Sequence, residues 1–271
     1  MIAECVTDGE KLYQFIEHRL ISKAKWNVLE TGLQYTGRKT ELIDFFHQLT
    51  IVNLAGRLVI GGASILERFN RDDPQFEHEL FTFLRDNLEI PPHLINETYR
   101  FVYRAVKASQ ESISDSLRRR FKRWAKNKHT HCYLCGVILD FDDTNSYRGF
   151  TCEHIWPRSY GGNSIEENLL PACKSCNSNK KGNFATWVMP AIQSLIMGFN
   201  PTSQRLQEID GCYKFALHYK IAQQLAIQKR FSLKHAFLKI GAWTEVRVSH
   251  PDDVADFFNL ENYESHSYLH L

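Results

Sequence analysis

Four cysteines in this sequence have the spacing of a metal site. They form two CxxC pairs, Cys132 with Cys135 and Cys173 with Cys176. Four thiolates complete the closed tetrahedral shell that structural zinc prefers, so we expect one Zn²⁺ here. Cys152 and His131 lie close in sequence and are alternative ligands, and two separate redox pairs or plain buried thiols are the other interpretation. The spacer is longer than in a compact zinc ribbon, so further structure must be built between the pairs.

The residues between and after these pairs occur in a characteristic order. Glu153-His154 is followed by Gly161-Gly162, then by Asn168-Leu169, and Asn177 comes directly after the second cysteine pair. This order resembles the ββα-metal motif of the HNH endonuclease family. In that motif an acidic residue and a histidine end a first strand, a glycine-rich loop leads to Asn-Leu on a second strand, and a short helix opens with CxxC. The resemblance covers less than a quarter of the chain.

The resemblance implies a role for each matching residue in phosphodiester hydrolysis. His154 would be the general base, because an imidazole with a pKa of about 6.5 can take a proton from water near neutral pH. Glu153 and Asn177 would hold a catalytic Mg²⁺ or Mn²⁺ through oxygen atoms. Asn168 would fix the loop and orient the histidine without taking part in the chemistry.

Two positions depart from the family pattern. The acidic residue is Glu153 where Asp is usual, and the last motif position is Asn177 in place of His. The first change lengthens the ligand arm by one methylene, and the second should shift the preference from zinc-like ions toward Mg²⁺ or Mn²⁺. Both residues keep an oxygen ligand, so we expect catalysis to be retained.

A basic segment precedes the first cysteine pair and is predicted to be a helix from Ser114 to about Asn127. No acidic residue occurs between Ser116 and Leu139. The basic residues, with Trp124 among them, are predicted to hold nucleic acid; a solvated helix face is the alternative. The predicted phosphate contacts are Arg118, Arg119, Arg120, Lys122, Arg123 and Lys126 here, and Arg158, Lys180 and Lys181 in the motif; Lys128 extends the cluster.

The chain as a whole is predicted to be mainly α with a small α+β module. We expect a helical domain over residues 1–113, the basic helix plus nuclease module over 114–190, and a helical region with an acidic tail over 191–271. Within the first domain, helix boundaries are expected at four places. These are Thr31-Gly32, Gly61-Gly62, Asp72-Asp73-Pro74 and Pro91-Pro92. Beyond the module, helices are expected over residues 184–197, with a kink at Pro190, and over residues 212–227.

The composition indicates a folded globular protein, because 43% of the residues are hydrophobic and 13% are aromatic. The net charge of +2 is too small to predict a polyanionic partner by itself. Seven cysteines, an odd number, fit a reducing compartment, and no secretory signal is seen at the N-terminus. Residues 51–66 are apolar but are predicted to be core, not a membrane span. The expected location is the cytoplasm.

These features together predict a Mg²⁺-dependent endonuclease that cuts DNA, most naturally duplex DNA. Small HNH proteins with an added helical domain resemble restriction or antiphage defence effectors, some of which act beside an ATPase or other sensor protein. The helical domain would then serve recognition, self-association or control by such a partner. The alternatives are a zinc-dependent nucleic-acid-binding or interaction module that does not cleave, and a nuclease that acts on RNA or nicks one strand.

Overall fold

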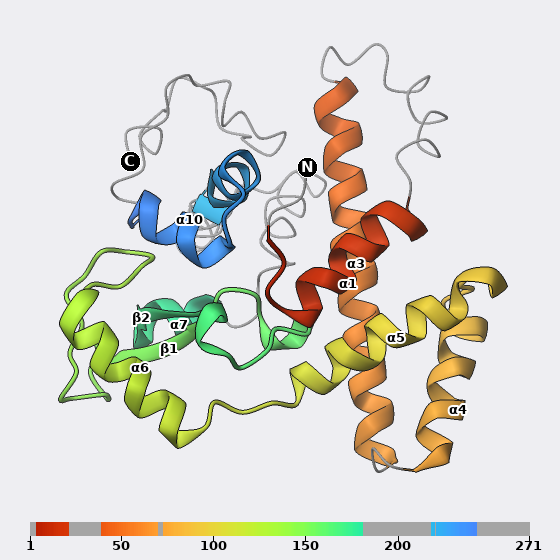
Figure 1. Cartoon of the computed structure of the whole chain (residues 1–271), viewed down its shortest axis with the longest axis horizontal. Coiled ribbons are helices and arrows are strands. Elements are labelled where there is room, and N and C mark those ends of the chain that lie inside the picture. The colour runs from red at the N-terminus through yellow and green to blue at the C-terminus, as the bar shows by residue number, and fades with distance from the viewer. Residues whose placement is uncertain (1–3, 22–38, 70–72, 181–217, 220, 243–271) are drawn as a thin grey trace, which may run out of the picture. The chain divides into compact units, whose positions relative to one another are not determined.

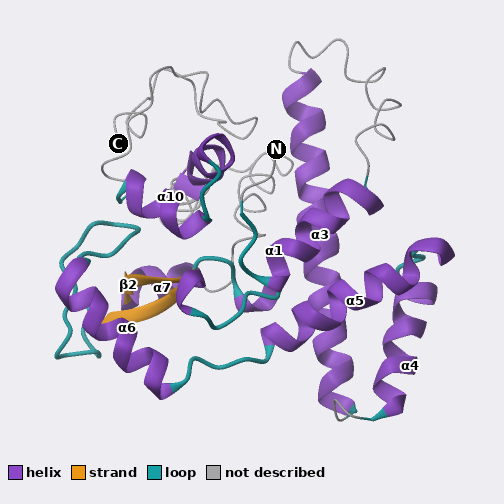
Figure 2. Ribbon diagram, viewed as in Figure 1, coloured by secondary structure: helices purple, strands orange, loops and turns teal. Residues whose placement is uncertain are grey.

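The computed structural model describes residues 4–21, 39–69, 73–180, 218–219 and 221–242, and their contacts group them into two compact units. Residues 5–113 and 154–168 form one, which we call the helical unit. Residues 114–153 and the described residues from 169 onward form the other, which we call the zinc unit. Helices predominate and a two-stranded sheet lies in the motif region (Figure 2), so the predicted mainly α fold with a small α+β module is confirmed.

In its described residues, the helical unit is built on four helices, two of which begin at the proline-containing turns that the sequence predicts. They are α1 (Asp8–Phe15), which continues through the π-helical turn Ile16–Leu20, α3 (Lys39–Arg68), α4 (Pro74–Thr82), which continues through Phe83–Asn87, and α5 (Pro92–Ser109). The Asp73 side chain accepts a hydrogen bond from the Gln75 amide, and Pro74 is the first residue of α4. Pro92 likewise begins α5. Both predicted helix starts are confirmed.

The predicted break at Gly61-Gly62 is wrong, because α3 runs through both glycines. A Cβ on Gly61 would overlap the Phe83 ring, and a Cβ on Gly62 would overlap Val106 of α5. The glycines therefore allow neighbouring helices to approach α3 closely, and their helix-weakening tendency is outweighed by this packing.

Helix α3 is the central element of the helical unit, and α1 and α5 pack against it (Figure 1). The segment Leu49–Arg68 is long and apolar enough to cross a membrane by length and composition alone. A core helix passes the same test, and Ile51, Leu58 and Ile65 are buried within this unit. The packing therefore supports the prediction that this segment belongs to the core.

The zinc unit combines the basic helix with the strands of the motif. Its elements are α6 (Asp115–Lys128), β1 (Phe150–His154), β2 (Leu169–Cys173), α7 (Lys174–Lys180) and α10 (Leu233–Ile240). The division between the two units falls within β1, because Glu153 is assigned to the zinc unit and His154 to the helical unit. Two short 3-10 turns, η4 (Arg158–Tyr160) and η5 (Glu166–Asn168), lie in the loop that joins the strands.

Helix α6 begins where the sequence predicts. The Ser114 side chain caps it by accepting a hydrogen bond from the Leu117 amide, 3.2 Å away. Its buried face consists of Leu117, Phe121 and Ala125, one residue per turn. Phe121 lies 6.3 Å from Phe150 of β1 between ring centroids, so α6 covers the strand.

Several predictions fall outside the described residues. They concern Thr31-Gly32, the helix over 184–197, the start of the helix over 212–227, the acidic tail, and Lys181. Residues 221–229 are helical and overlap the end of the second predicted C-terminal helix, 212–227. The division into three domains stays a prediction.

Candidate active site and zinc centre

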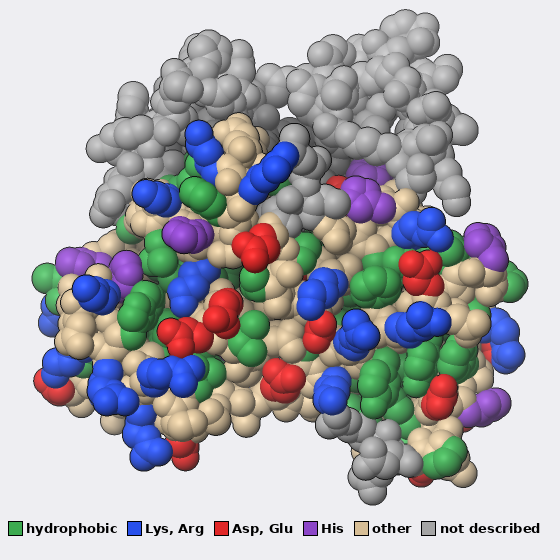
Figure 3. Space-filling model, in the orientation of Figure 1, with side chains coloured by type: hydrophobic (Ala, Val, Ile, Leu, Met, Phe, Trp, Pro, Cys, Tyr) green, Lys and Arg blue, Asp and Glu red, His purple; other side chains and the backbone are tan. Residues whose placement is uncertain are grey.

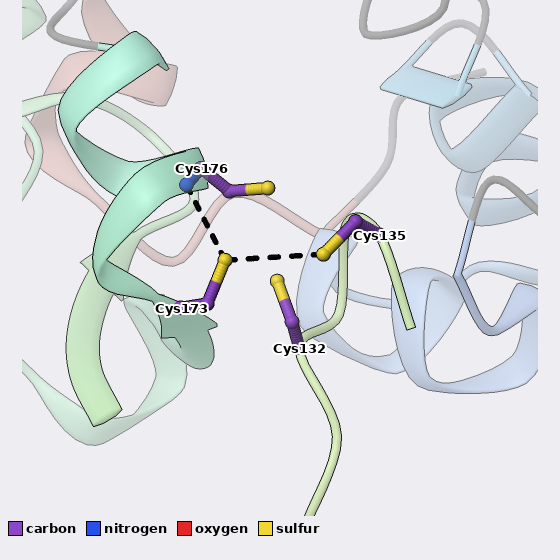
Figure 4. Close-up of side chains that lie close together, drawn as sticks. All are labelled: Cys132, Cys135, Cys173 and Cys176. Atoms are coloured by element: carbon purple, nitrogen blue, oxygen red, sulfur yellow. Dashed lines mark hydrogen bonds between the residues drawn. The ribbon is translucent and has the colours of Figure 1, made fainter. Parts of the chain in front are cut away.

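The four cysteines of the two CxxC pairs come together in space (Figure 4). Their sulfur atoms all lie within 4.8 Å of one another, and Cys135 Sγ is 3.8 Å from Cys173 Sγ. A tetrahedron of sulfurs at the usual Zn–S length of about 2.3 Å has edges of about 3.8 Å. The donor set therefore fits a zinc ion, and the spacing is far too long for a disulfide.

Backbone amide groups connect the two cysteine pairs to the strand and the helix of the motif. The Tyr133 amide, in the first CxxC loop, donates to the Pro171 carbonyl of β2. The Cys176 amide donates to Cys173 Sγ at 3.3 Å, which favours a thiolate at that position. Cys173 ends β2 and Cys176 lies in the first turn of α7, so a zinc ion here would fix the junction of strand and helix.

Strand β1 ends with the acidic residue and the histidine, as predicted. Glu153 is buried, with 8% of its surface exposed, and His154 is half-buried. Burial raises the pKa of the Tyr133 phenol well above its usual value, and the nearby negative charge of Glu153 adds to this effect. Because the carboxylate is partly shielded from water, it would attract a bound cation more strongly than an exposed one.

Asn168 fixes the loop between the strands from its buried position. Its Oδ1 accepts a hydrogen bond from the Trp156 amide at 2.8 Å. Its Nδ2 donates to the carbonyls of Trp156 and Asn163, at 3.0 and 2.9 Å. The Asn168 carbonyl accepts from the Ile155 amide, one residue after His154. One side chain therefore ties both ends of the loop together beside the histidine.

The loop at residues 154–168 packs directly onto the helices of its unit. The Gly9 amide at the start of α1 donates to the Gly161 carbonyl at 2.8 Å. Gly161 has a φ of +81°, a conformation that favours glycine, and a Cβ there would lie 2.6 Å from Ala105 of α5. Trp156 Nε1 donates to the Tyr160 carbonyl, and both groups lie against Gly9. A Cβ on Gly9 would overlap the Trp156 nitrogen and the Tyr160 oxygen. The helices thus hold the loop that begins at His154.

His154 itself contacts a residue of this loop. Its Nε2 lies 3.0 Å from Ser164 Oγ. Ser164 Oγ donates to the Glu111 backbone carbonyl at 3.1 Å, and the Ser164 amide donates to Glu111 Oε2 at 3.2 Å. The sequence did not point to either partner: Ser164 lies in the loop without a motif position, and Glu111 follows α5 far away in the chain.

The basic side chains of α6 form a strongly charged surface. Seven of its fourteen residues are Arg or Lys, and blue side chains gather over this helix on the face shown in Figure 3. Burial raises the pKa of Cys152 in β1 to about 11, and the charge of Arg118 partly opposes this rise. Arg118 therefore lies within electrostatic range of Cys152, in the middle of β1. Lys126 lies toward the other end of α6, 3.7 Å from exposed Asp142.

The remaining predicted residues have varied surroundings. Arg158 donates through Nη2 to the Ser109 carbonyl at the end of α5. Asn177 is half-exposed on α7. Trp124 stacks on Phe121 and lies under the Lys234 ammonium, 4.8 Å from the ring centroid, so it serves packing between α6 and α10. Nothing is described of the Lys180 side chain.

Comparison with known proteins agrees with this geometry. Residues 132–186 match the family model of HNH endonucleases. The match covers about a fifth of the chain, and it includes all four clustered cysteines and the Glu153-His154 pair. No curated protein and no solved structure matches the chain. The chain therefore contains an HNH endonuclease module with a cysteine cluster suited to zinc, which supports a nuclease function on nucleic acid.

Proposed function

We propose that this protein is a metal-dependent endonuclease that hydrolyses DNA phosphodiester bonds. The observation that carries the proposal is the combination within one matched module of a four-thiol cluster and a histidine held at the end of β1 beside a buried carboxylate. A structural zinc ion would join β2 to α7. The two strands and this helix would then form a rigid base for the reacting groups.

Each motif residue has a proposed task in the reaction. His154 takes the proton from the attacking water, a task that imidazole side chains commonly perform in enzymes. Glu153 and Asn177 offer oxygen ligands of the kind that Mg²⁺ or Mn²⁺ prefers, and such an ion supplies charge neutralisation at the phosphate. Asn168 keeps the loop in place through its bonds to Trp156 and Asn163.

The basic helix is proposed to bind the DNA backbone. Arg118, Arg119 and Arg123 are exposed and form no ion pair among the described residues. Phosphate contacts of this kind carry no sequence information, so they fit a nuclease whose preference is set elsewhere. Among the other predicted contacts, Arg158 already binds the end of α5, which makes it the weaker candidate.

The wider setting is proposed from the family resemblance. We propose a cytoplasmic antiphage or restriction effector that acts with a partner ATPase or sensor, and whose helical unit binds that partner or a second copy of the chain. A basic helix beside a nuclease module is compatible with this role but does not name a partner.

The deciding experiment incubates purified protein with supercoiled plasmid in Mg²⁺, in Mn²⁺ and in EDTA, beside a His154→Ala variant. We expect metal-dependent nicking or linearisation by the wild type and a loss of at least about 10²-fold in the variant. Zinc content, measured by atomic emission, should stay at one ion per chain in both proteins. Binding without cleavage by a zinc-loaded wild type would favour the non-cleaving module, and cleavage of RNA alone would favour the RNA nuclease.

A further inference from the structure

The hydrogen bonds around Ser164 determine how the ring of His154 is held. Ser164 Oγ has a single proton, and the Glu111 carbonyl 3.1 Å away can only accept. If that proton points to Glu111, the hydroxyl oxygen is left to accept from His154 Nε2, 3.0 Å away. The opposite arrangement would place two oxygen acceptors against each other without a proton between them.

We propose that Ser164 and Glu111 are positioning residues that hold neutral His154 with its proton on Nε2, so that Nδ1 is the basic nitrogen. This inference rests on the proposed function of His154 as general base. It adds two residues that no motif position assigns, one of them outside the matched module. The basic nitrogen of a general base must face the water it deprotonates, and a fixed tautomer ensures this.

Two hydrogen bonds to Glu111 fix the position of Ser164, the hydrogen-bond partner of His154. The carboxylate accepts from the Ser164 amide at 3.2 Å while the backbone carbonyl of the same residue accepts from the hydroxyl. Two bonds from one residue fix both the backbone and the side chain of Ser164. Glu111 follows directly on α5, whose Ala105 supports Gly161 of the same loop. The orientation of the histidine is therefore set by the helical unit.

The first measurement is independent of cleavage and uses the full-length protein. Two-dimensional ¹⁵N–¹H correlation of histidine rings is recorded at about pH 8.5, two units above the ordinary histidine pKa, and His154 is assigned by the loss of its signals in His154→Gln. We expect the Nε2–H tautomer to predominate in the wild type and in Ser164→Thr. Ser164→Ala should lose this preference, and Ser159→Ala, which changes an exposed serine of the same loop, should keep it.

The second measurement is plasmid cleavage by the same variants. Ser164→Ala should lower kcat by about 10–100-fold, as loss of an orienting partner usually does, with KM and zinc content unchanged. Ser164→Thr should restore most of the rate. Glu111→Ala should resemble Ser164→Ala in direction, whereas Glu111→Gln, which keeps both acceptors, should have little effect.

The outcomes separate this inference from the proposed function. If the wild type does not cleave, the nuclease proposal fails, yet the ring measurement still tests the tautomer. An unchanged tautomer in Ser164→Ala overturns the inference. So does a changed tautomer with a wild-type kcat, because the ring orientation would then not matter for the reaction.

Discussion

Single residues of the loop between β1 and β2 stabilise its conformation through buried hydrogen bonds, in addition to the roles that the motif assigns to them. Asn168 is 1% exposed and satisfies one amide and two carbonyls, all in the backbone of the same loop. Such a group is costly to remove, because the buried backbone groups that it serves would lose their partners. Its conformational role can therefore be measured as stability, separately from any effect on cleavage.

We expect Asn168→Ala to lower the free energy of unfolding of the helical unit by about 3 kcal/mol, from three lost hydrogen bonds and unpaired backbone groups. Denaturant titration followed by tryptophan fluorescence measures this change, since Trp156 lies at the site. Glu167→Ala, an exposed neighbour, is the matched control and should change stability by less than about 0.5 kcal/mol. Equal midpoints for the two variants would show that the Asn168 bonds do not hold the loop.

A residue's role could be predicted from the sequence where its partners lie close to it in the chain, and not where they lie far away. The cysteine pairs and Glu153-His154 were found because their spacing lies within one short module, and the structure does bring the thiols together. Ser164 was missed because its partner Glu111 lies 53 residues away. Gly61-Gly62 was misread for the same reason, since its cause is contact with Phe83 and Val106 on other helices.

At the scale of elements, the way in which α6 packs along β1 determines which basic side chains lie near each end of the strand. Phe121 packs near Phe150, and Arg118, nearly one turn earlier in the helix, lies near Cys152, two residues later in the strand. The helix and the strand therefore run in opposite directions. By this register the N-terminal part of α6 lies toward the end of β1 at which His154 stands, and Lys126 lies toward the other end.

This register predicts unequal effects of charge removal along α6. Arg118→Ala should weaken DNA binding by about tenfold, equivalent to about 1.4 kcal/mol, and reduce the salt slope of binding by about one. Lys126→Ala should have a smaller effect on both quantities, because its ammonium lies 3.7 Å from the Asp142 carboxylate and, by this register, farther from the end of β1 at which His154 stands. Fluorescence anisotropy with labelled duplex DNA in EDTA, over a range of salt concentrations, measures both.

Two results would contradict this ordering. Equal losses for Arg118→Ala and Lys126→Ala would mean that α6 attracts DNA through its total charge and not through its register on β1. No loss in either variant, with cleavage intact, would mean that the helix face is only solvated, which was the alternative interpretation of the sequence.

At the scale of the whole molecule, the chain passes between the two units within the HNH module itself. Strand β1 begins in the zinc unit, and the loop from His154 to Asn168 belongs to the helical unit before β2 returns to the zinc unit. The family match defines the module by its sequence, but the loop between β1 and β2 packs on helices that lie outside the match. An isolated module would lack the surface that supports His154, and no sequence pattern indicated this.

This arrangement predicts that a change far from the motif disturbs catalysis without disturbing zinc. Gly9→Ala places a Cβ against the Tyr160 carbonyl and Trp156 Nε1, so α1 or the loop must move. We expect a loss of about 1–3 kcal/mol of stability from overpacking and about 10²-fold slower plasmid cleavage, since small displacements of catalytic groups are costly. Zinc content should stay unchanged because all four thiols lie in the zinc unit.

The matched control for Gly9→Ala is Gly56→Ala on α3. The nearest atoms to its Cβ would be those at the phenol end of Tyr160, at 3.0–3.2 Å, so a shift of that side chain by a few tenths of an ångström is enough to make room. Cleavage by Gly56→Ala should therefore stay within about threefold of the wild type, which corresponds to less than 1 kcal/mol. If Gly9→Ala cleaves as fast as Gly56→Ala, the contact between α1 and the loop does not position His154. A loss of zinc in Gly9→Ala would instead mean that the helical unit also supports the thiol cluster.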